Sequence, residues 1–190
     1  EEKMKIYADS ENGYDGIADE YERWCTGDDS YKPSLKFYLE YLESHSGPFL
    51  ELGIGTGRIA LEAIRSNRKH IVGVDISANM LKKCEEKYKI LKKDSAEAGT
   101  LRLMKMRMED IAFCEEFEVV YLPFRTVGHI MTDPDLELVF RNVYKALLPG
   151  GSSSSCLARV RSWASVRSSC AASSSTIHAK PTNSTAICLI

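Results

Sequence analysis

Residues 49–61, FLELGIGTGRIAL, place Gly53, Gly55 and Gly57 between two apolar runs. Glycine weakens both strands and helices, because its backbone loses the most conformational freedom on folding. The run FLEL before the glycines is typical of a short buried strand, and a helical pattern follows over about 58–66. A glycine loop at this junction lets a ligand approach the backbone, since no Cβ intervenes. The N-terminus of the following helix offers N–H groups and a positive dipole end, which suit a phosphate or a carboxylate.

Strand and helix patterns alternate along the rest of the chain. Strands alternating with amphipathic helices predict an α/β fold, a doubly wound and mostly parallel sheet with helices on both faces. Ligands bind such sheets at the carboxyl ends of the strands. The predicted helices cover 14–24, about 33–46, about 58–66, the segment capped by Ser77, and a last segment that Asp133 caps, with Pro134 in its first turn and its end at LLPGG. The predicted strands are 49–53, 70–75, 101–106 and 117–122.

Composition excludes several classes of function. A length of 190 residues favours a single domain. The net charge of −2 indicates no general basic surface for nucleic acid. No apolar run approaches the roughly 20 residues of a membrane span, and the charged start EEKMK lacks the apolar region of a secretory signal. The six cysteines show neither CxxC spacing nor a histidine partner, so we expect no metal site and reduced thiols in the cytoplasm.

The spacing of the glycines separates the candidate ligands. A nicotinamide fingerprint requires G-x-G-x-x-G, and a P-loop requires Lys-Ser/Thr where this chain has Arg58-Ile59. The remaining match is E/D-x-G-x-G-x-G, with Glu51 as its acidic residue. At this loop the chain resembles the class I S-adenosylmethionine-dependent methyltransferases, and the resemblance extends over residues 14–151. It implies a Rossmann-like fold and S-adenosylmethionine as the cofactor.

The resemblance also assigns residues to the cofactor. Asp75, which ends the second predicted strand, would hold both ribose hydroxyls, and Asp110 in RMEDIAF (107–113) would accept a hydrogen bond from the adenine amino group. Tyr14 and Tyr21, in a segment that resembles the family's N-terminal cap, would lie near the sulfonium, where aromatic faces favour a cation; packing in the core is the alternative. The full predicted set is Tyr14, Tyr21, Glu51, Gly53, Gly55, Gly57, Arg58, Asp75, Ile76, Met80, Glu109, Asp110, Ile111, Leu122 and Pro123.

The segment LPFRTVGHIM (122–131) is where the acceptor site is expected. It is similar to the small-molecule N-methyltransferases that act on amino sugars, and this similarity implies that His129 faces the acceptor. Imidazole titrates near pH 6.5, so His129 is the candidate general base, with a simple backbone hydrogen bond as the alternative. Arg125 departs from the small polar residue of that subfamily and would suit an acidic acceptor instead.

The implied function is therefore methyl transfer to an amine or hydroxyl of a small molecule. Two alternatives stay open: a module that binds S-adenosylmethionine without transferring methyl, and a dinucleotide-dependent oxidoreductase, which the position of the third glycine disfavours. The sequence does not decide between N- and O-methylation, and it identifies neither the acceptor nor the oligomeric state.

The composition changes after Gly151. Residues 152–190 are rich in serine and contain no Asp or Glu, and their four basic residues are Arg159, Arg161, Arg167 and Lys180. Family members continue past LPGG into a fifth strand, a crossover helix and an antiparallel pair, which need roughly 45 residues, and only CLARV (156–160) reads as a weak strand here. We therefore expect a cofactor-binding domain over 1–151, with a helical cap over about 1–46, and a sheet that is incomplete after its fourth strand. A changed reading frame or a cloning scar explains such a tail, and a genuine degenerate tail is the alternative.

Overall fold

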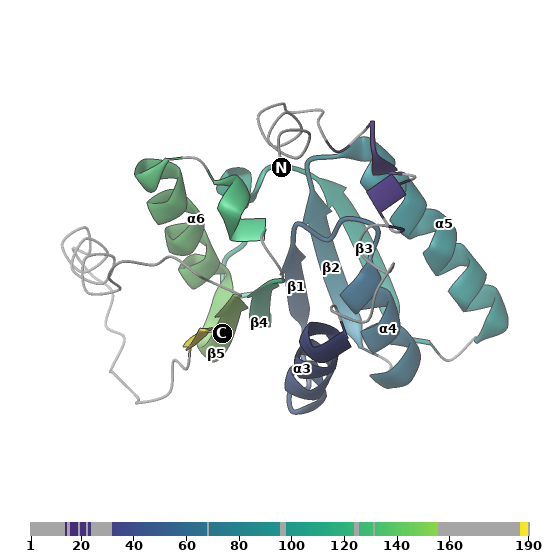
Figure 1. The fold of residues 1–190 in the computed structure, drawn as a ribbon. Coiled ribbons are helices and arrows are strands. Elements are labelled where there is room, and N and C mark those ends of the chain that lie inside the picture. Colours follow the sequence, from purple (N-terminus) through teal and green to yellow (C-terminus); the bar gives the residue numbers. More distant parts are fainter. Residues whose placement is uncertain are drawn as a thin grey trace.

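The computed structural model contains one parallel sheet with the strand order β3-β2-β1-β4-β5-β6 (Figure 1). The strands are β1 (Phe49–Leu52), β2 (His70–Asp75), β3 (Thr100–Lys105), β4 (Phe117–Leu122), β5 (Leu147–Ser155) and β6 (Ile187–Leu189). The helices are α3 (Lys32–Glu43), α4 (Arg58–Asn67), α5 (Ala78–Asp94) and α6 (Asp133–Ala146), with short 3₁₀ turns η2 (Met108–Asp110) and η3 (Thr126–His129). The structure describes residues 14, 16–18, 20, 21, 23, 32–67, 69–95, 98–123, 126–130, 132–155 and 187–189.

The order of the strands places a topological switch between β1 and β4. From β1 the chain adds β2 and β3 on one side, and it then returns to add β4 on the other side. In open α/β sheets, ligands bind outside the carboxyl ends of the strands at such a switch. The glycine loop, residues 53–57, follows β1 at this position.

Helices cover both faces of the sheet, as the sequence predicts. On one face, α3, α4 and α5 bury apolar side chains against the strands, including Tyr38, Ile59 and Leu81. On the other face, α6 buries Val139 and Val143. Figure 1 shows α6 on one side of the sheet and α3, α4 and α5 on the other. The predicted fold class is confirmed.

Side-chain caps mark the N-terminal ends of two helices, α5 and α6. The Ser77 hydroxyl accepts a hydrogen bond from the Met80 N–H at 3.1 Å, so it caps α5 as predicted. The prediction that Asp133 caps α6 is wrong. Thr132 caps that helix instead, because its backbone is extended and its hydroxyl accepts from the Asp135 N–H at 3.2 Å. Of the helix predicted over 14–24, the described residues 18, 20, 21 and 23 are helical, and Trp24 lies outside the described residues.

The expectation that the sheet is incomplete after its fourth strand is also wrong. Residues 147–155, including the expected turn LLPGG, form β5, which pairs in parallel with β4 up to Leu122 opposite Ser155. Ladder hydrogen bonds come from the backbone, which serine supplies as well as valine does. The β6 strand then runs parallel to β5, whereas the resemblance implied an antiparallel pair. The strand predicted at 156–160 lies outside the described residues.

Among the helices within the described ranges, none combines the length and the apolar character that crossing a membrane requires.

Candidate functional site

The glycine loop has a backbone that only glycine adopts easily. The φ angles of Gly53, Gly55 and Gly57 are 70°, 56° and 82°, in the left-handed region. A Cβ on Gly57 would lie 2.4 Å from the Cys84 sulfur, and one on Gly53 would lie 2.4 Å from Cγ2 of Thr126. The first glycine therefore lets η3 pack on the loop, and the third lets α5 pack beneath it.

The middle glycine leaves open space. Among the described residues, the nearest atom to a Cβ on Gly55 would be Cε1 of Tyr21, at 3.9 Å, and no other atom of these residues outside its chain neighbours would come within 4 Å. The Gly55 N–H donates to Oδ2 of Asp75 at 2.7 Å, and the Ser77 N–H donates to Oδ1 at 2.9 Å. These bonds orient the carboxylate beside the loop. Each of its oxygens can accept a second hydrogen bond, so the acceptor chemistry fits a pair of ribose hydroxyls.

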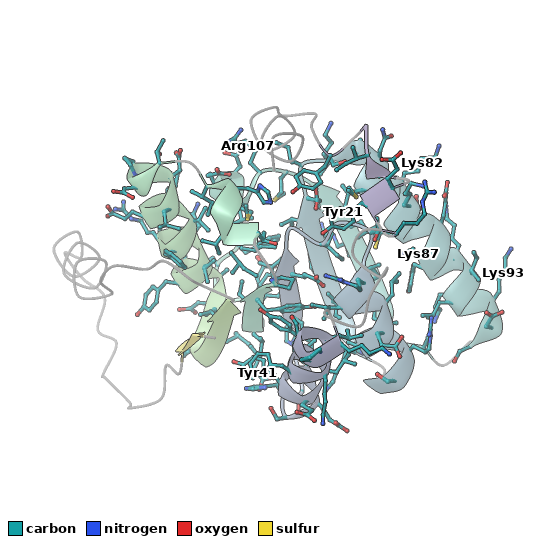
Figure 2. All side chains as sticks on the ribbon, viewed as in Figure 1. Tyr21, Tyr41, Lys82, Lys87, Lys93 and Arg107 are labelled. Atoms are coloured by element: carbon teal, nitrogen blue, oxygen red, sulfur yellow. The ribbon has the colours of Figure 1, made fainter. Side chains whose placement is uncertain are left out.

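Two tyrosines and a histidine meet above this loop. The Tyr14 hydroxyl lies 3.0 Å from Nε2 of His129, although 115 positions separate them in the sequence. The Tyr14 ring contacts the rings of His129 and Tyr21 edge-on, with centroid distances of 5.3 and 5.9 Å. In Figure 2, Tyr21 lies at the same end of the sheet as Arg107, which follows β3, whereas Tyr41 lies at the opposite end. The three side chains therefore gather at the carboxyl ends of the strands.

The surroundings of His129 favour its neutral form. Burial lowers the pKa of the imidazole below its usual 6.5, and the nearby negative charge of Asp75 opposes this shift only in part. His129 is therefore mostly neutral at pH 7. A neutral imidazole can accept a proton, which general-base catalysis requires.

The residues expected beside the adenine follow β3. Asp110 is exposed, whereas the side chain of Glu109 is only 12% exposed and lies 3.2 Å from a guanidinium nitrogen of Arg107. Asn142 of α6 donates to the Glu109 carbonyl at 2.8 Å, and Ile111 is buried beneath the turn. The η2 turn is thus anchored on α6, with Asp110 at the surface.

The other predicted residues lie at the same edge at different depths. Ile76 is half-buried directly after Asp75, and Met80 is buried in the first turn of α5. Leu122 and Pro123 are buried at the end of β4, and the Pro123 carbonyl accepts from the Thr126 hydroxyl at 2.6 Å. Arg125 lies outside the described residues.

Glu51 differs from the rest of the predicted set. Its side chain is in the core, with 2% of the residue exposed, and its carboxyl accepts from the Tyr121 hydroxyl at 2.8 Å. Sequence reasoning missed Tyr121 and Thr126, because a tyrosine in a strand and a threonine in a loop carry no pattern of their own. Only the fold shows that both residues support the glycine loop.

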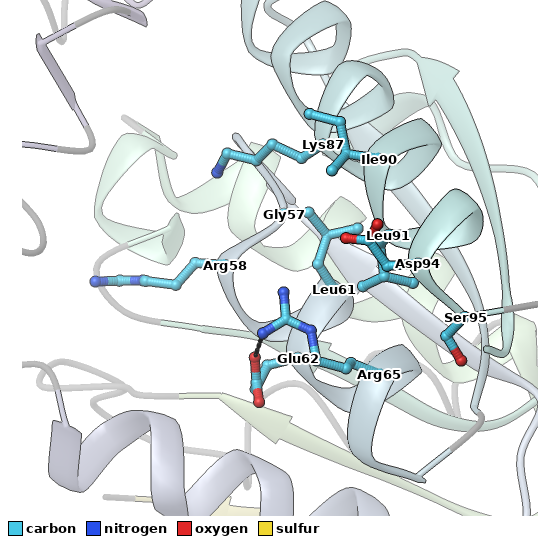
Figure 3. Close-up of a pocket in the computed structure, with 10 residues that line it drawn as sticks. All are labelled: Gly57, Arg58, Leu61, Glu62, Arg65, Lys87, Ile90, Leu91, Asp94 and Ser95. Carbon is cyan, nitrogen blue, oxygen red and sulfur yellow. Dashed lines mark hydrogen bonds and ion pairs between the residues drawn. The ribbon is translucent and has the colours of Figure 1, made fainter.

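A surface groove lies behind the loop, between α4 and α5 (Figure 3). It has a volume of about 670 Å³, and Gly57, Leu61 and Ile90 are among its lining residues. Lys87 also lines the groove and donates to the Thr56 carbonyl at 3.2 Å, and desolvation lowers its pKa. Tyr14, Tyr21 and His129 are not among the residues that line this groove, so it is separate from the site that they form. No group of His, Cys, Asp or Glu within the described ranges could hold a metal ion.

A family model described as a methyltransferase domain matches residues 49–151, more than half of the chain. The chain belongs to the methyltransferase-domain family. Among curated proteins, this chain is similar to phosphoethanolamine N-methyltransferase 2 of Caenorhabditis elegans, with 29% identity over 122 residues. That match covers 64% of this chain and 26% of the relative, so the chain spans about a quarter of the relative's length.

Solved structures agree with this assignment. The CcbJ methyltransferase from Streptomyces caelestis has a TM-score of 0.62 and 26% identity, covering 75% of this chain and 56% of that one. An S-adenosylmethionine-dependent methyltransferase from Clostridium acetobutylicum ATCC 824 has a TM-score of 0.57 and 24% identity, covering 74% and 55%. The predicted methyltransferase family is confirmed. The alternative of a dinucleotide-dependent oxidoreductase is thereby abandoned.

Proposed function

We propose that this chain transfers a methyl group from S-adenosylmethionine to an amine or hydroxyl of a small molecule. The observation that carries this proposal is the hydrogen bond between Tyr14 and His129 beside the glycine loop. The similarity to a phosphoethanolamine N-methyltransferase favours an amine as the acceptor. The amino-sugar subclass, the cytoplasmic location and the domain boundary at residue 151 stay predictions, and β5 runs across that boundary.

The residues at the carboxyl edge fit the cofactor. Asp75 would hold the ribose hydroxyls, and Asp110 would accept from the adenine amino group. Gly55 leaves room for the ligand to approach the backbone. Leu122 and Pro123 would line the methionine end. When bound, S-adenosylmethionine supplies an electrophilic methyl group on a sulfonium.

Tyr14 and His129 suit the removal of a proton from the acceptor. An ammonium group must lose a proton before its lone pair can attack, and a neutral imidazole can take that proton. With the imidazole proton on Nδ1, the Tyr14 hydroxyl donates to Nε2 and fixes the orientation of the ring. The proton then reaches Nε2 by relay: the Tyr14 hydroxyl passes its own proton to Nε2 and takes the proton of the acceptor. The Tyr14 and Tyr21 rings also offer faces that attract a cation.

The test is a calorimetric titration with S-adenosylmethionine, followed by an assay over amines and hydroxyls that includes phosphoethanolamine and an amino sugar. We expect binding and the methylation of at least one amine. Binding without turnover on any acceptor would favour the module that only binds the cofactor. A chain that melts cooperatively but does not bind S-adenosylmethionine would overturn the proposal.

A further inference from the structure

Glu51 is a buried carboxyl group immediately before the glycine loop, with only 2% of the residue exposed. Its Oε2 atom accepts from the Tyr121 hydroxyl at 2.8 Å, and its carboxyl also accepts from the backbone N–H of Ala60. Tyr121 belongs to β4 and Ala60 to the first turns of α4. One side chain thus joins the strand before the loop, the strand beside it and the helix after it.

Tyr121 is itself fixed in position by the pairing of β4 with β1 and by the packing of α3. The register of β1 and β4 places it opposite Glu51, and the residue is fully buried. Its ring centroid lies 6.0 Å from that of Tyr38 on α3, and the Tyr38 hydroxyl donates to the Leu122 carbonyl at 3.4 Å. The tyrosine hydroxyl therefore reaches Glu51 from a fixed position, which a support for the loop requires.

The bond to Ala60 closes the far end of the loop. At the start of the loop, the N–H groups of Gly53 and Ile54 donate to the Val74 carbonyl at 2.9 and 3.0 Å. At the end, the first N–H groups of a helix lack acceptors within that helix, and Glu51 supplies one of them. The glycines are free to adopt many backbone shapes, so contacts at both ends must select the shape that is observed.

Burial raises the pKa of the Glu51 carboxyl to about 8, so the group is mostly neutral at pH 7. The hydrogen bond from Tyr121 and the positive charge of Arg58 oppose this shift. Asp75 on β2 adds to it, and the Glu51 charge in turn helps to raise the pKa of the Cys84 thiol on α5. A neutral carboxyl has a donor and acceptors, as the amide of glutamine has, whereas leucine keeps the volume and loses both.

We propose that Glu51 is a positioning residue, which holds the glycine loop in its binding shape through Tyr121 and Ala60 and does not touch the cofactor. The inference rests on the proposed function, because it concerns the same cofactor site. It differs from the assignment of Glu51 as a cofactor contact in one testable respect. A positioning role makes the effects of Glu51 and Tyr121 on cofactor affinity depend on each other.

The experiment is a double-mutant cycle with S-adenosylhomocysteine as the calorimetric probe, using E51Q, E51L, Y121F and E51L/Y121F. E51L should weaken binding roughly 10-fold or more, because the Tyr121 hydroxyl and the Ala60 N–H lose their buried acceptor. E51Q should stay within about 3-fold of wild type. Y121F should weaken binding in wild type and have no further effect in E51L. In turnover assays, E51L should raise KM for S-adenosylmethionine and leave kcat largely unchanged.

The controls are E85L and Y144F, which change an exposed glutamate on α5 and an exposed tyrosine on α6. Wild-type affinity in E51L, equal losses in E51Q and E51L, or additive losses in the cycle would each overturn the inference. Should E51L fail to melt cooperatively, unchanged affinity in Y121F would overturn it. If wild type itself does not bind the probe, the proposed function fails together with the inference. If wild type binds and E51L binds equally well, only the inference fails.

Discussion

The two neighbours of β4 are encoded in different ways. On one side is β1, whose four residues are all buried and lead into three glycines with positive φ angles. On the other side is β5, which contains the serine segment, residues 152–155, and pairs with β4 through its backbone. The glycine loop depends on side chains that fit only one arrangement. The serine segment becomes a strand because the edge of β4 offers backbone N–H and C=O groups to pair with, and the serines themselves do not encode this pairing.

The largest effect is expected from His129→Ala, which removes the proposed base beside the glycine loop. It should slow methyl transfer by ~10²–10⁴ and leave S-adenosylmethionine affinity nearly unchanged. In wild type, kcat/KM should rise with pH through a value below 6.5 and then level off, because burial lowers the pKa of His129. Rates and calorimetric affinities at pH 5–9 check this prediction. Wild-type turnover in the variant would reduce His129 to a structural contact.

Asp75→Ala tests the proposed cofactor contact at the carboxyl edge of the sheet. The variant should bind S-adenosylmethionine more weakly by roughly 1.5–3 kcal/mol, the range for hydrogen bonds to a charged group. It also loses the acceptor of the Gly55 N–H, so the loop is less well held. Asp94→Ala, at an exposed position on α5, is the matched control for calorimetry. Equal affinities in the two variants would remove Asp75 from the site.

Glu51 should make the stability of the loop side depend on pH. Folding raises its pKa from 4.5 to about 8, so its neutral form stabilises the fold fully below pH 4.5. This contribution is lost progressively as the pH rises from 4.5 to 8, with a slope of at most about 1.4 kcal/mol per pH unit for one proton. Urea unfolding of wild type and Glu51→Gln at pH 5–9 should show wild type losing stability relative to the variant. Parallel curves would contradict the raised pKa.

The smallest effect is expected on the other side of β4. Ser154 pairs with β4 opposite Tyr121 and with β6 opposite Cys188. Ser154→Thr should stabilise the protein by up to about 1 kcal/mol, because threonine has the higher strand propensity. Thermal melting checks this, with Ser46→Thr at an exposed position between α3 and β1 as the control. A destabilised Ser154→Thr variant would speak against β5 as a strand in solution.

Sequence reasoning succeeded where side-chain chemistry is local. It predicted the bounds of β2 and β4 to the residue, and it identified the Ser77 cap. It also proposed Tyr14, Tyr21 and His129 for one site, and the structure brings these three together, although their roles await the experiments above.

The misses share a physical cause. The cap at Thr132 and the β5 strand depend on backbone geometry. Without that geometry, Asp133 looks as good a cap as Thr132, and a run of serines looks as much like a loop as a strand. Tyr121 was missed because its partner, Glu51, is 70 positions away and meets it only through the register of two strands. Such partners are fixed by tertiary structure rather than by neighbouring residues.

The buried thiol of Cys84 can report local opening of the glycine loop. Its sulfur fills the space beside Gly57 where other residues have a Cβ, so the loop shields it from solvent. A thiol reagent can reach it only during local opening, whereas the exposed Cys114 should react without any opening. Burial also raises the pKa of the Cys84 thiol, so the reactive thiolate is scarce even when the loop opens. The labelling rate of the Cys84 sulfur therefore measures how often the glycine loop separates from α5. A ligand bound to the loop should lower that rate.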